Sequence, residues 1–451
     1  MPSSTICALA TPAGGAIGII RISGDDAIGI VDRIFVSSKK RLSECNGHTL
    51  HYGHINDADG NTLDEVLVSL FRAPRSYTGE DSVEIACHGS QFILREALRS
   101  LISAGCRQAA PGEFTQRAFL NGKMDLSQAE AVADLIASTN RATHKMAMSQ
   151  LKGCFSDELK LLREQLLNIN SLLELELDFS DHEELEFADR SELLELVNTA
   201  DRKIQKLANS FETGNAIKQG IPVAIVGKTN VGKSSLLNVL LQEDKAIVSD
   251  IHGTTRDCIE DVVDINGISF RFIDTAGIRE TSDTIERIGI ERTYSNISKS
   301  NIVMWVIDEQ PTEAELQDML DKTIEKKLII VKNKADLNIL FPTPENIPCV
   351  EISAKQQQNI DALLSLLVKT ADIPEISENS IIVNNIRHYE SLIRSHEHLA
   401  RVRQSLEIGL SGDIVSEDLK LVLHELADIT GGLISTSETL NNIFSHFCIG
   451  K

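Results

Sequence analysis

A glycine-rich segment at residues 227–234, with the sequence GKTNVGKS, constrains the fold of this chain more than any other feature. It follows an apolar run at Val223–Val226 and precedes a stretch with helical periodicity, which is the context that a phosphate-binding loop requires. Its glycines let backbone N–H groups surround phosphates, the Lys233 ammonium suits β- and γ-phosphate oxygens, and the Ser234 hydroxyl suits Mg²⁺. The segment therefore predicts a strand, a phosphate-binding loop and a helix within an α/β sheet.

Three later motifs occur in the order that a guanine-nucleotide site requires. The motif DTAG at 274–277 ends a predicted strand, where its aspartate can reach Mg²⁺ through water and its glycine amide can bind a γ-phosphate. The motif NKAD at 333–336 ends a later strand, and the Asp336 carboxylate can accept hydrogen bonds from the N1–H and amino groups of guanine, which adenine does not offer. The motif SAK at 353–355 would contact the base through its backbone. Together these motifs predict a GTP site.

A predicted switch segment, GTTRD at 253–257, lies between the phosphate-binding loop and the DTAG motif. Thr255 is the candidate second hydroxyl ligand of Mg²⁺. Arg256 is either a catalytic arginine or an ordinary surface residue. Ile278 follows the DTAG motif, where many small GTPases have a glutamine that orients the attacking water. Hydrolysis must therefore use another group, and the next carboxylates along the chain belong to Glu280, Asp283 and Glu286.

The 451 residues are too many for one ordinary core, so two or three domains are expected. Short alternating apolar runs predict a small α+β domain first, and apolar residues three or four apart between 124 and 211, and again after Pro374, predict long amphipathic helices. Between them an α/β sheet is expected, with a hairpin turn at Asn266–Gly267. The predicted strands are at Gly18–Ile22, Val66–Phe71, Ser82–Ala86, Val223–Val226, Val262–Ile265, Ile268–Ile273, Ile302–Ile307, Leu328–Val331 and Val350–Ile352. We therefore expect a helical domain interrupted by an inserted α/β domain, with domains at 1–118, 119–215, 216–375 and 376–451.

The formal net charge of −22 argues against a general RNA-coating protein, because polyphosphate would be repelled at long range. Ten carboxylates lie within residues 174–195, which is either a solvated helix face or loop, or a docking surface for a basic partner. No apolar stretch is long enough to span a bilayer, and Met1–Ala10 lack the charged region and long apolar core of a secretory signal, so we expect a cytoplasmic protein without a membrane partner. The eight cysteines include no CxxC pair and are interpreted as reduced thiols.

Besides the GTPase motifs, the chain has distinctive segments near both ends: Ala10–Pro12, Gly18–Gly24, Tyr77–Asp81, Pro111–Asn121 and the terminal Cys448–Lys451. With these segments the chain resembles, along essentially its whole length, the MnmE (TrmE) family of tRNA modification GTPases. The resemblance implies an N-terminal α+β domain that binds 5-formyl- or 5,10-methylene-tetrahydrofolate and forms a homodimer, and a Ras-like α/β GTPase domain inserted into a helical domain. The matching folate positions are Arg21, Glu84, Lys123 and Lys451. Arg21 and Lys123 suit a carboxylate or a polar pterin edge, and Glu84 suits the pterin amino group.

For the GTPase domain, the family implies a K⁺ ion beside the phosphates in the place of an arginine finger, and pairing of two such domains when GTP and K⁺ are bound. The implied K⁺ ligands are Asn230, Ser249, Ile251 and Thr254, and those of Mg²⁺ are Ser234 and Thr255. Glu286 matches the family's catalytic carboxylate. Cys448 is either part of the modification chemistry or an incidental cysteine. With the motifs above, the predicted GTP contacts are Asn230, Val231, Gly232, Lys233, Ser234, Ser235, Ser249, Asp250, Ile251, His252, Gly253, Thr254, Thr255, Asp274, Thr275, Ala276, Gly277, Asn333, Lys334, Asp336, Ser353, Ala354 and Lys355.

The sequence departs from the family at Lys228-Thr229, where Arg-Pro is common, and in a slightly short glycine-rich stretch after Pro12. The resemblance implies an enzyme that works with an FAD-binding partner similar to MnmG (GidA), in a heterotetramer or larger complex. The pair would add an aminomethyl or carboxymethylaminomethyl group to C5 of the wobble uridine of certain tRNAs, with folate as the one-carbon source. Two alternatives are an Era-like switch in ribosome assembly and a GTP-driven scaffold without modification activity. The first would require a basic RNA-binding module and the second a degraded folate site.

Overall fold

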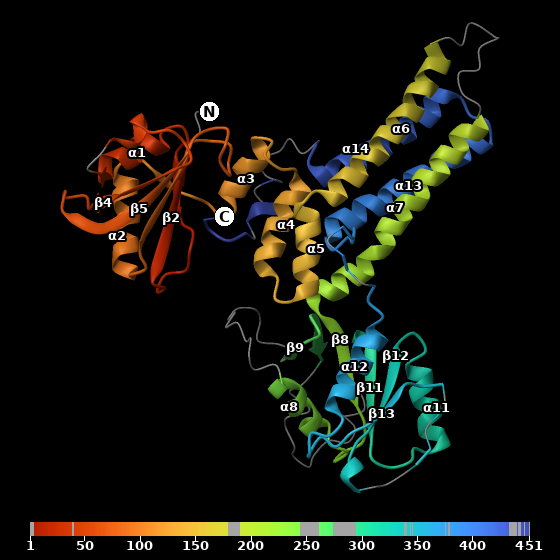
Figure 1. The fold of residues 1–451 in the computed structure, drawn as a ribbon. Helices are drawn as coiled ribbons and strands as arrows, with labels where there is room; N and C mark the ends of the chain where they lie inside the picture. The colour runs from red at the N-terminus through yellow and green to blue at the C-terminus, as the bar shows by residue number, and fades with distance from the viewer. Residues whose placement is uncertain are drawn as a thin grey trace. The chain divides into compact units, whose positions relative to one another are not determined.

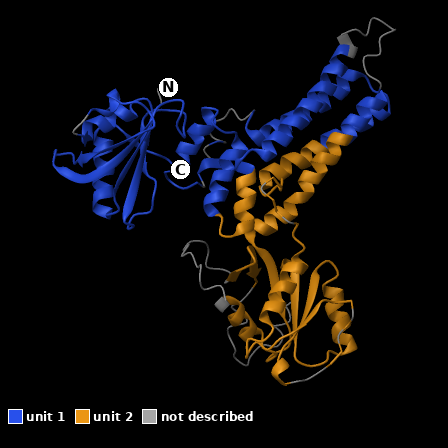
Figure 2. Cartoon of the chain, viewed as in Figure 1, with its two compact units in different colours: residues 1–137, 150–198, 397–451 blue, residues 138–149, 199–396 orange. Residues whose placement is uncertain are grey.

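The computed structural model describes residues 4–37, 40–178, 190–243, 261–273, 295–337, 341–342, 344, 346–374, 376–377, 379–432, 440, 443–445 and 447–450 (Figure 1). The chain forms two compact units (Figure 2). Unit 1 comprises residues 1–137, 150–198 and 397–451, and unit 2 comprises 138–149 and 199–396. The expected fold class, an N-terminal α+β region and a helical region interrupted by a Ras-like α/β sheet, is confirmed.

Unit 1 begins with a mixed seven-stranded sheet in the order β3-β4-β5-β6-β2-β1-β7. Helices α1 and α2 bury one face of this sheet, because alternate residues such as Ile20, Val68 and Ile85 are apolar and join a core with the two helices. The opposite face carries Arg21 and Glu84. The elements are β1 (Ile6–Leu9), β2 (Ile17–Ser23), α1 (Ala27–Ile34), β3 (Phe35–Val36), η1 (Leu42–Glu44), β4 (Thr49–Asn56), β5 (Thr62–Phe71), β6 (Ser82–His88), α2 (Gln91–Ser103), β7 (Arg107–Gln108) and α3 (Glu113–Leu120).

Long helices form the remainder of unit 1 and part of unit 2. In α6, the periodic residues Leu159, Leu162, Leu166 and Ile169 are all buried, as their spacing predicts. Helix α6 packs on α14, where Asn170 Oδ1 accepts a buried 2.8 Å hydrogen bond from Ser416 Oγ. The helices are α4 (Leu126–Ala137), α5 (Arg141–Leu151), α6 (Cys154–Asp178), α7 (Arg190–Gln219), α13 (Ile386–Glu407) and α14 (Gly412–Thr430).

Unit 2 contains a six-stranded sheet in the order β13-β12-β11-β8-β10-β9, parallel except for the β9–β10 hairpin. The central strands β8 and β11 are buried along their whole lengths, which explains their uninterrupted apolar sequences. The elements are β8 (Ile221–Val226), α8 (Lys233–Glu243), β9 (Asp261–Ile265), β10 (Ile268–Phe272), β11 (Ile302–Ile307), α11 (Glu313–Lys322), β12 (Lys327–Lys332), η2 (Ala335–Leu337), β13 (Cys349–Glu351) and α12 (Ile360–Ala371).

Candidate functional site

The phosphate-binding loop connects β8 to α8 and is closely packed. Gly227 has φ +151°, and a Cβ at this position would lie 2.3 Å from the carbonyl oxygen of Val306 on β11. A Cβ on Gly232, which has φ +98°, would lie 2.1 Å from Asn333 Nδ2. Larger side chains are therefore excluded at both glycines, which keeps the backbone open toward a phosphate.

Lys233, at the start of α8, has a partly buried ammonium. Its Nζ donates hydrogen bonds to the carbonyl oxygens of Gly227 at 2.7 Å and Lys228 at 2.6 Å. Burial lowers the pKa of Lys233, because the charged form loses hydration. An anion beside this ammonium would compensate for the lost hydration, so the environment of Lys233 fits a phosphate ligand.

Asn333 joins the phosphate-binding loop to the predicted base-binding segment. It is buried, its Nδ2 donates to Val231 O at 2.8 Å, and its Oδ1 accepts from the Ala354 amide at 3.0 Å. Beside it, Asp336 Oδ1 accepts a 2.7 Å hydrogen bond from Ser353 Oγ, which fixes the orientation of the carboxylate. The loops after β8, β12 and β13 therefore meet at the carboxyl edge of the sheet, where open α/β sheets bind ligands.

Lys228 and Lys334 make further ion pairs at this edge. Lys228 Nζ lies 2.9 Å from both Glu309 Oε1 and Glu315 Oε1, and these two carboxylates raise its pKa. Lys334 Nζ donates to Asp308 Oδ2 at 2.6 Å. The residue that departs from the family pattern, Lys228, thus connects the phosphate-binding loop to the N-terminus of α11.

The structure brings together the predicted GTP residues that it describes: Asn230, Val231, Gly232, Lys233, Ser234, Ser235, Asn333, Lys334, Asp336, Ser353, Ala354 and Lys355. Thirteen other predicted GTP, metal, catalytic or folate residues lie outside the described part of the chain: Ser249, Asp250, Ile251, His252, Gly253, Thr254, Thr255, Asp274, Thr275, Ala276, Gly277, Glu286 and Lys451. Arg256, Glu280 and Asp283 lie outside it as well.

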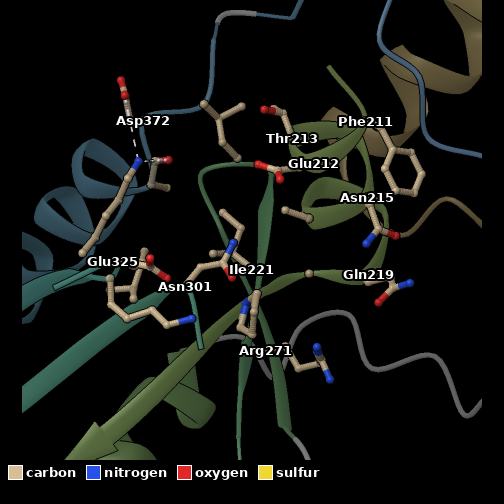
Figure 3. A pocket seen from close by; sticks show the side chains of 18 residues that line it. Phe211, Glu212, Thr213, Asn215, Gln219, Ile221, Arg271, Asn301, Glu325 and Asp372 are labelled. Carbon is tan, nitrogen blue, oxygen red and sulfur yellow. Dashed lines mark hydrogen bonds and ion pairs between the residues drawn. The ribbon is translucent and has the colours of Figure 1, made fainter. Parts of the chain in front are cut away.

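A separate cavity of about 850 Å³ opens at the opposite end of the same strands (Figure 3). It is lined by the end of α7, the start of β8 and the end of α12, and it includes charged side chains of both signs such as Arg271, Glu212 and Asp372. Because the phosphate-binding loop follows the other end of β8, this cavity is not the nucleotide site.

A second polar cluster lies on the open face of the N-terminal sheet. Arg21 and Glu84 are paired across β2 and β6, and Glu84 Oε1 accepts from Arg21 Nε at 2.9 Å and lies 2.9 Å from Arg21 Nη2. The guanidinium lies 5.5 Å from the Tyr77 ring centroid and 5.8 Å from that of Phe114. Two of the predicted folate residues are therefore in direct contact.

Lys123 lies against the loop that carries Tyr77. Its Nζ donates to Pro74 O at 3.0 Å, and a Cβ on Gly79 would lie 3.4 Å from Lys123 Cγ. Lys123 and Arg21 thus both lie beside this loop, and the contact of Tyr77 with Arg21 was not predicted from the sequence. The signal that the sequence offered for Tyr77 was its place in the segment YTGED at 77–81, one of the segments that carry the family resemblance.

The C-terminal segment returns to the N-terminal sheet within unit 1. Ile449 pairs with Pro111, the Gly112 amide donates to Cys448 O at 3.3 Å, and Arg21 Nη1 donates to Gly450 O at 3.4 Å. Cys448 is exposed. The predicted folate pair and the C-terminal cysteine thus belong to one neighbourhood.

Family models and curated proteins match the chain along its length. A model described as the MnmE helical domain matches residues 126–448, and one described as the GTP-binding protein TrmE N-terminus matches residues 5–123. A tRNA modification GTPase MnmE from Bacteroides fragilis is 55% identical over 100% of both chains. The chain belongs to the MnmE family of tRNA modification GTPases. The MnmE resemblance seen in the sequence is therefore confirmed.

Other MnmE relatives agree with this assignment. The MnmE protein of Bacteroides thetaiotaomicron is 54% identical over 100% of both chains, and that of Flavobacterium johnsoniae is 50% identical over 99% of both. Among solved structures, the G domain of a FeoB iron transporter from T. maritima is 24% identical, with 34% of this chain and 99% of that chain covered and a TM-score of 0.26.

Proposed function

We propose that this chain is a K⁺-stimulated GTPase that modifies tRNA together with an FAD-binding protein similar to MnmG (GidA). The pair adds a carboxymethylaminomethyl or aminomethyl group to C5 of the wobble uridine, and a tetrahydrofolate derivative supplies the one-carbon unit. Membership of the family establishes the coarser part, a GTP-hydrolysing enzyme of tRNA modification. The observation that carries the finer part is the contact of Arg21 with both Glu84 and the C-terminal segment beside Cys448.

The nucleotide site supports GTP with Mg²⁺ as the hydrolysed substrate. The described residues fit a phosphate because glycine is required at two positions of the loop and the Lys233 ammonium is partly buried. Ser234 and Thr255 would hold Mg²⁺, which neutralises phosphate charge when bound. Asn230, Ser249, Ile251 and Thr254 would hold K⁺, and Glu286 would orient the attacking water indirectly. Asn230 has the left-handed φ of +63° within the loop.

The N-terminal cluster supports a folate derivative as the second ligand. Both contacts between Arg21 and Glu84 are made through Glu84 Oε1, and the second carboxylate oxygen suits the amino edge of a pterin. Lys123 and Lys451, which follows Gly450 in the sequence, would attract the glutamate carboxylates of the ligand. Cys448 lies in the same neighbourhood and is proposed to take part in the modification chemistry.

The open face of the N-terminal sheet supports a homodimer. Leu50 and Tyr52 on β4 and Ile17 on β2 are each 63% exposed, and Leu67, the cross-strand partner of Tyr52, is 43% exposed. Paired residues of an antiparallel sheet point to the same side, so these side chains form one apolar face with Arg21 and Glu84. A second copy of the chain would cover this face, which helices leave open, and would form part of the folate site.

The charge distribution supports a division of labour with the partner. With a formal net charge of −22, the chain would leave most of the tRNA contact to the FAD-binding protein or to a local basic patch. In the part of the chain that the structure describes, each helix is too short or too polar to cross a bilayer. We propose that the enzyme works in the cytoplasm.

Nucleoside mass spectrometry tests the proposed function. Bulk tRNA from a strain that lacks this gene should have lost a C5-aminomethyl-type uridine, and restoration of the gene should restore it. Unchanged tRNA in a strain without a second copy of the gene would contradict the modification role and favour the Era-like switch. Restoration with a Cys448→Ser variant tests the cysteine: full recovery of the modified uridine would contradict its chemical role.

A further inference from the structure

The loop at residues 74–82 forms one wall of the N-terminal polar cluster. Tyr77 in this loop is 37% exposed although Arg21 lies against its ring. Its hydroxyl is hydrogen-bonded to Thr115 Oγ1 on α3 at 2.8 Å, so the phenol is fixed at its far end. Burial of part of the side chain raises the pKa of Tyr77, and the phenol stays neutral at physiological pH. The loop therefore presents a rigid, neutral aromatic surface beside the proposed folate residues.

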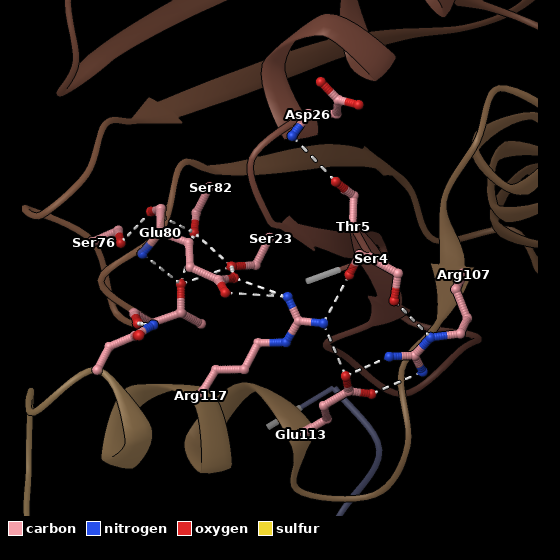
Figure 4. Close-up of polar contacts among 12 residues, drawn as sticks. Ser4, Thr5, Ser23, Asp26, Ser76, Glu80, Ser82, Arg107, Glu113 and Arg117 are labelled. Carbon is pink, nitrogen blue, oxygen red and sulfur yellow. Dashed lines mark hydrogen bonds and ion pairs between the residues drawn. The ribbon is translucent and has the colours of Figure 1, made fainter. Parts of the chain in front are cut away.

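A buried ion pair holds this loop in place (Figure 4). Glu80 accepts from Arg117 Nη1 at 3.0 Å through Oε2 and at 3.3 Å through Oε1, and Ser23 Oγ also donates to it at 2.8 Å. Arg117 in turn donates through Nη2 to Ser4 O at 2.8 Å and to Glu113 Oε1 at 3.0 Å. The loop is thus tied to β2, to α3 and to the segment before β1.

Glu113, which is also buried, links Arg117 to Arg107 in this hydrogen-bond network. Burial alone would raise the pKa of Glu113, but hydrogen bonds from Arg107, from the Ala110 amide and from Arg117 together lower it. The carboxylate therefore stays ionised and keeps Arg117 oriented toward Glu80. On the other side of the loop, Asn121 Nδ2 donates to Thr78 O at 2.7 Å, next to Tyr77. The loop is held on both sides, and the side chain of Tyr77 between these contacts is exposed.

We propose that Tyr77 is a ligand-contacting residue of the folate site, where its exposed ring stacks on the pterin ring of the folate derivative. Glu80 and Arg117 are positioning residues that keep the loop in the shape that presents this ring. A pterin ring stacked on the Tyr77 side chain would lie beside Arg21 and Glu84, whose charged groups suit the polar edge of the pterin. The inference rests on the proposed folate function and adds a stacking surface to its charged residues.

Binding of 5-formyl-tetrahydrofolate to the intact chain, measured by calorimetry, tests the role of Tyr77. Tyr77→Leu should weaken the Kd about tenfold, and Tyr77→Phe, which keeps the ring, should weaken it less. Phe92→Leu is the matched control, because Phe92 is an exposed ring with Arg95 at 5.9 Å on helix α2, outside the cluster. Equal affinity of Tyr77→Leu and the parent chain would overturn the inference. A parent chain that binds no folate derivative would instead overturn the folate proposal, and this inference with it.

A double-mutant cycle tests the positioning role. Glu80→Gln should weaken folate binding in the parent chain and leave it unchanged in the Tyr77→Leu background, because Glu80 acts through Tyr77. Arg117→Lys, which keeps the charge, should retain more affinity than Glu80→Gln. Additive effects of Glu80→Gln and Tyr77→Leu would overturn the positioning role.

Discussion

At the residue scale, the environment of each cysteine decides its reactivity. Cys87 on β6 is buried, and its burial, reinforced by the charge of Asp64, raises the pKa of its thiol to about 12. A hydrogen bond with Cys7 and burial raise the pKa of Cys106 as well. Cys448 is exposed at the C-terminal segment. The thiolate is the nucleophile, so these environments predict a large difference in rate between buried and exposed thiols.

We expect a short treatment with iodoacetamide at pH 8 to alkylate Cys448 and to leave Cys87 and Cys106 unmodified. A pKa of about 12 leaves a thiolate fraction at Cys87 of only about 10⁻⁴ at this pH. Peptide mass spectrometry of the digested chain reads out each site. In urea the same treatment should modify all three cysteines, which controls for peptide recovery. Modification of Cys87 in the folded chain as rapidly as Cys448 would contradict the predicted environments.

The GTP residues could be predicted because their chemistry is local to short motifs. Lys233, Asn333 and Asp336 each follow a strand at the carboxyl edge of one sheet, and the structure places all three there. The contact of Arg21 with Glu84 could not be predicted in this way. It depends on the register of β2 against β6, two strands that are far apart in sequence, and the pattern of single side chains does not fix that register.

At the element scale, the strands of the α/β sheet were the most predictable part of the fold. The apolar run at Ile302–Ile307 coincides with β11, and the Asn266–Gly267 turn joins β9 to β10 as predicted. Strand β4 was not predicted, because its alternation mixes His and Tyr with apolar residues. The periodicity after Pro374 does not bring every leucine into the core: Leu421 of α14 is 45% exposed, since it lies about 140° around the helix from buried Leu426.

The hairpin turn allows a stability test of backbone geometry. Gly267 has φ +81°, and a Cβ there would lie 3.0 Å from Arg141 Cβ at the start of α5. We expect Gly267→Ala to lower the free energy of unfolding by about 1 to 2 kcal/mol. Asn266→Gly is the matched control, because Asn266 also has a positive φ of +56° and glycine adopts it freely; its effect should be below about 0.5 kcal/mol. Urea unfolding followed by the fluorescence of Trp305, the single tryptophan, measures both. Equal stability of Gly267→Ala and the parent would contradict the expected strain.

At the scale of the whole molecule, the sequence predicted which segments contain functional residues. It predicted less well which of these segments are in contact with one another. The pairing of Ile449 with Pro111 joins the last residues of the chain to the N-terminal region. Gly112 is required at this contact, because a Cβ there would lie 2.8 Å from Phe444 O. Local periodicity carries no information about such distant pairing. The family resemblance predicted a shared role for these segments, and the structure supplies the contact between them.

The proposed K⁺ site predicts that the rate of GTP hydrolysis by the enzyme depends on which monovalent cation is present. We expect GTP turnover to be at least about tenfold faster in KCl than in NaCl at the same ionic strength, because K⁺ would occupy the place of an arginine finger, a device worth roughly 10³- to 10⁵-fold. Equal ionic strength removes general screening as a cause. Asn230→Ala should lose the difference between the salts and keep its affinity for a fluorescent GDP analogue. Equal turnover of the parent in both salts would eliminate the cation site, and Arg256 would then be the next candidate for stabilising the transition state.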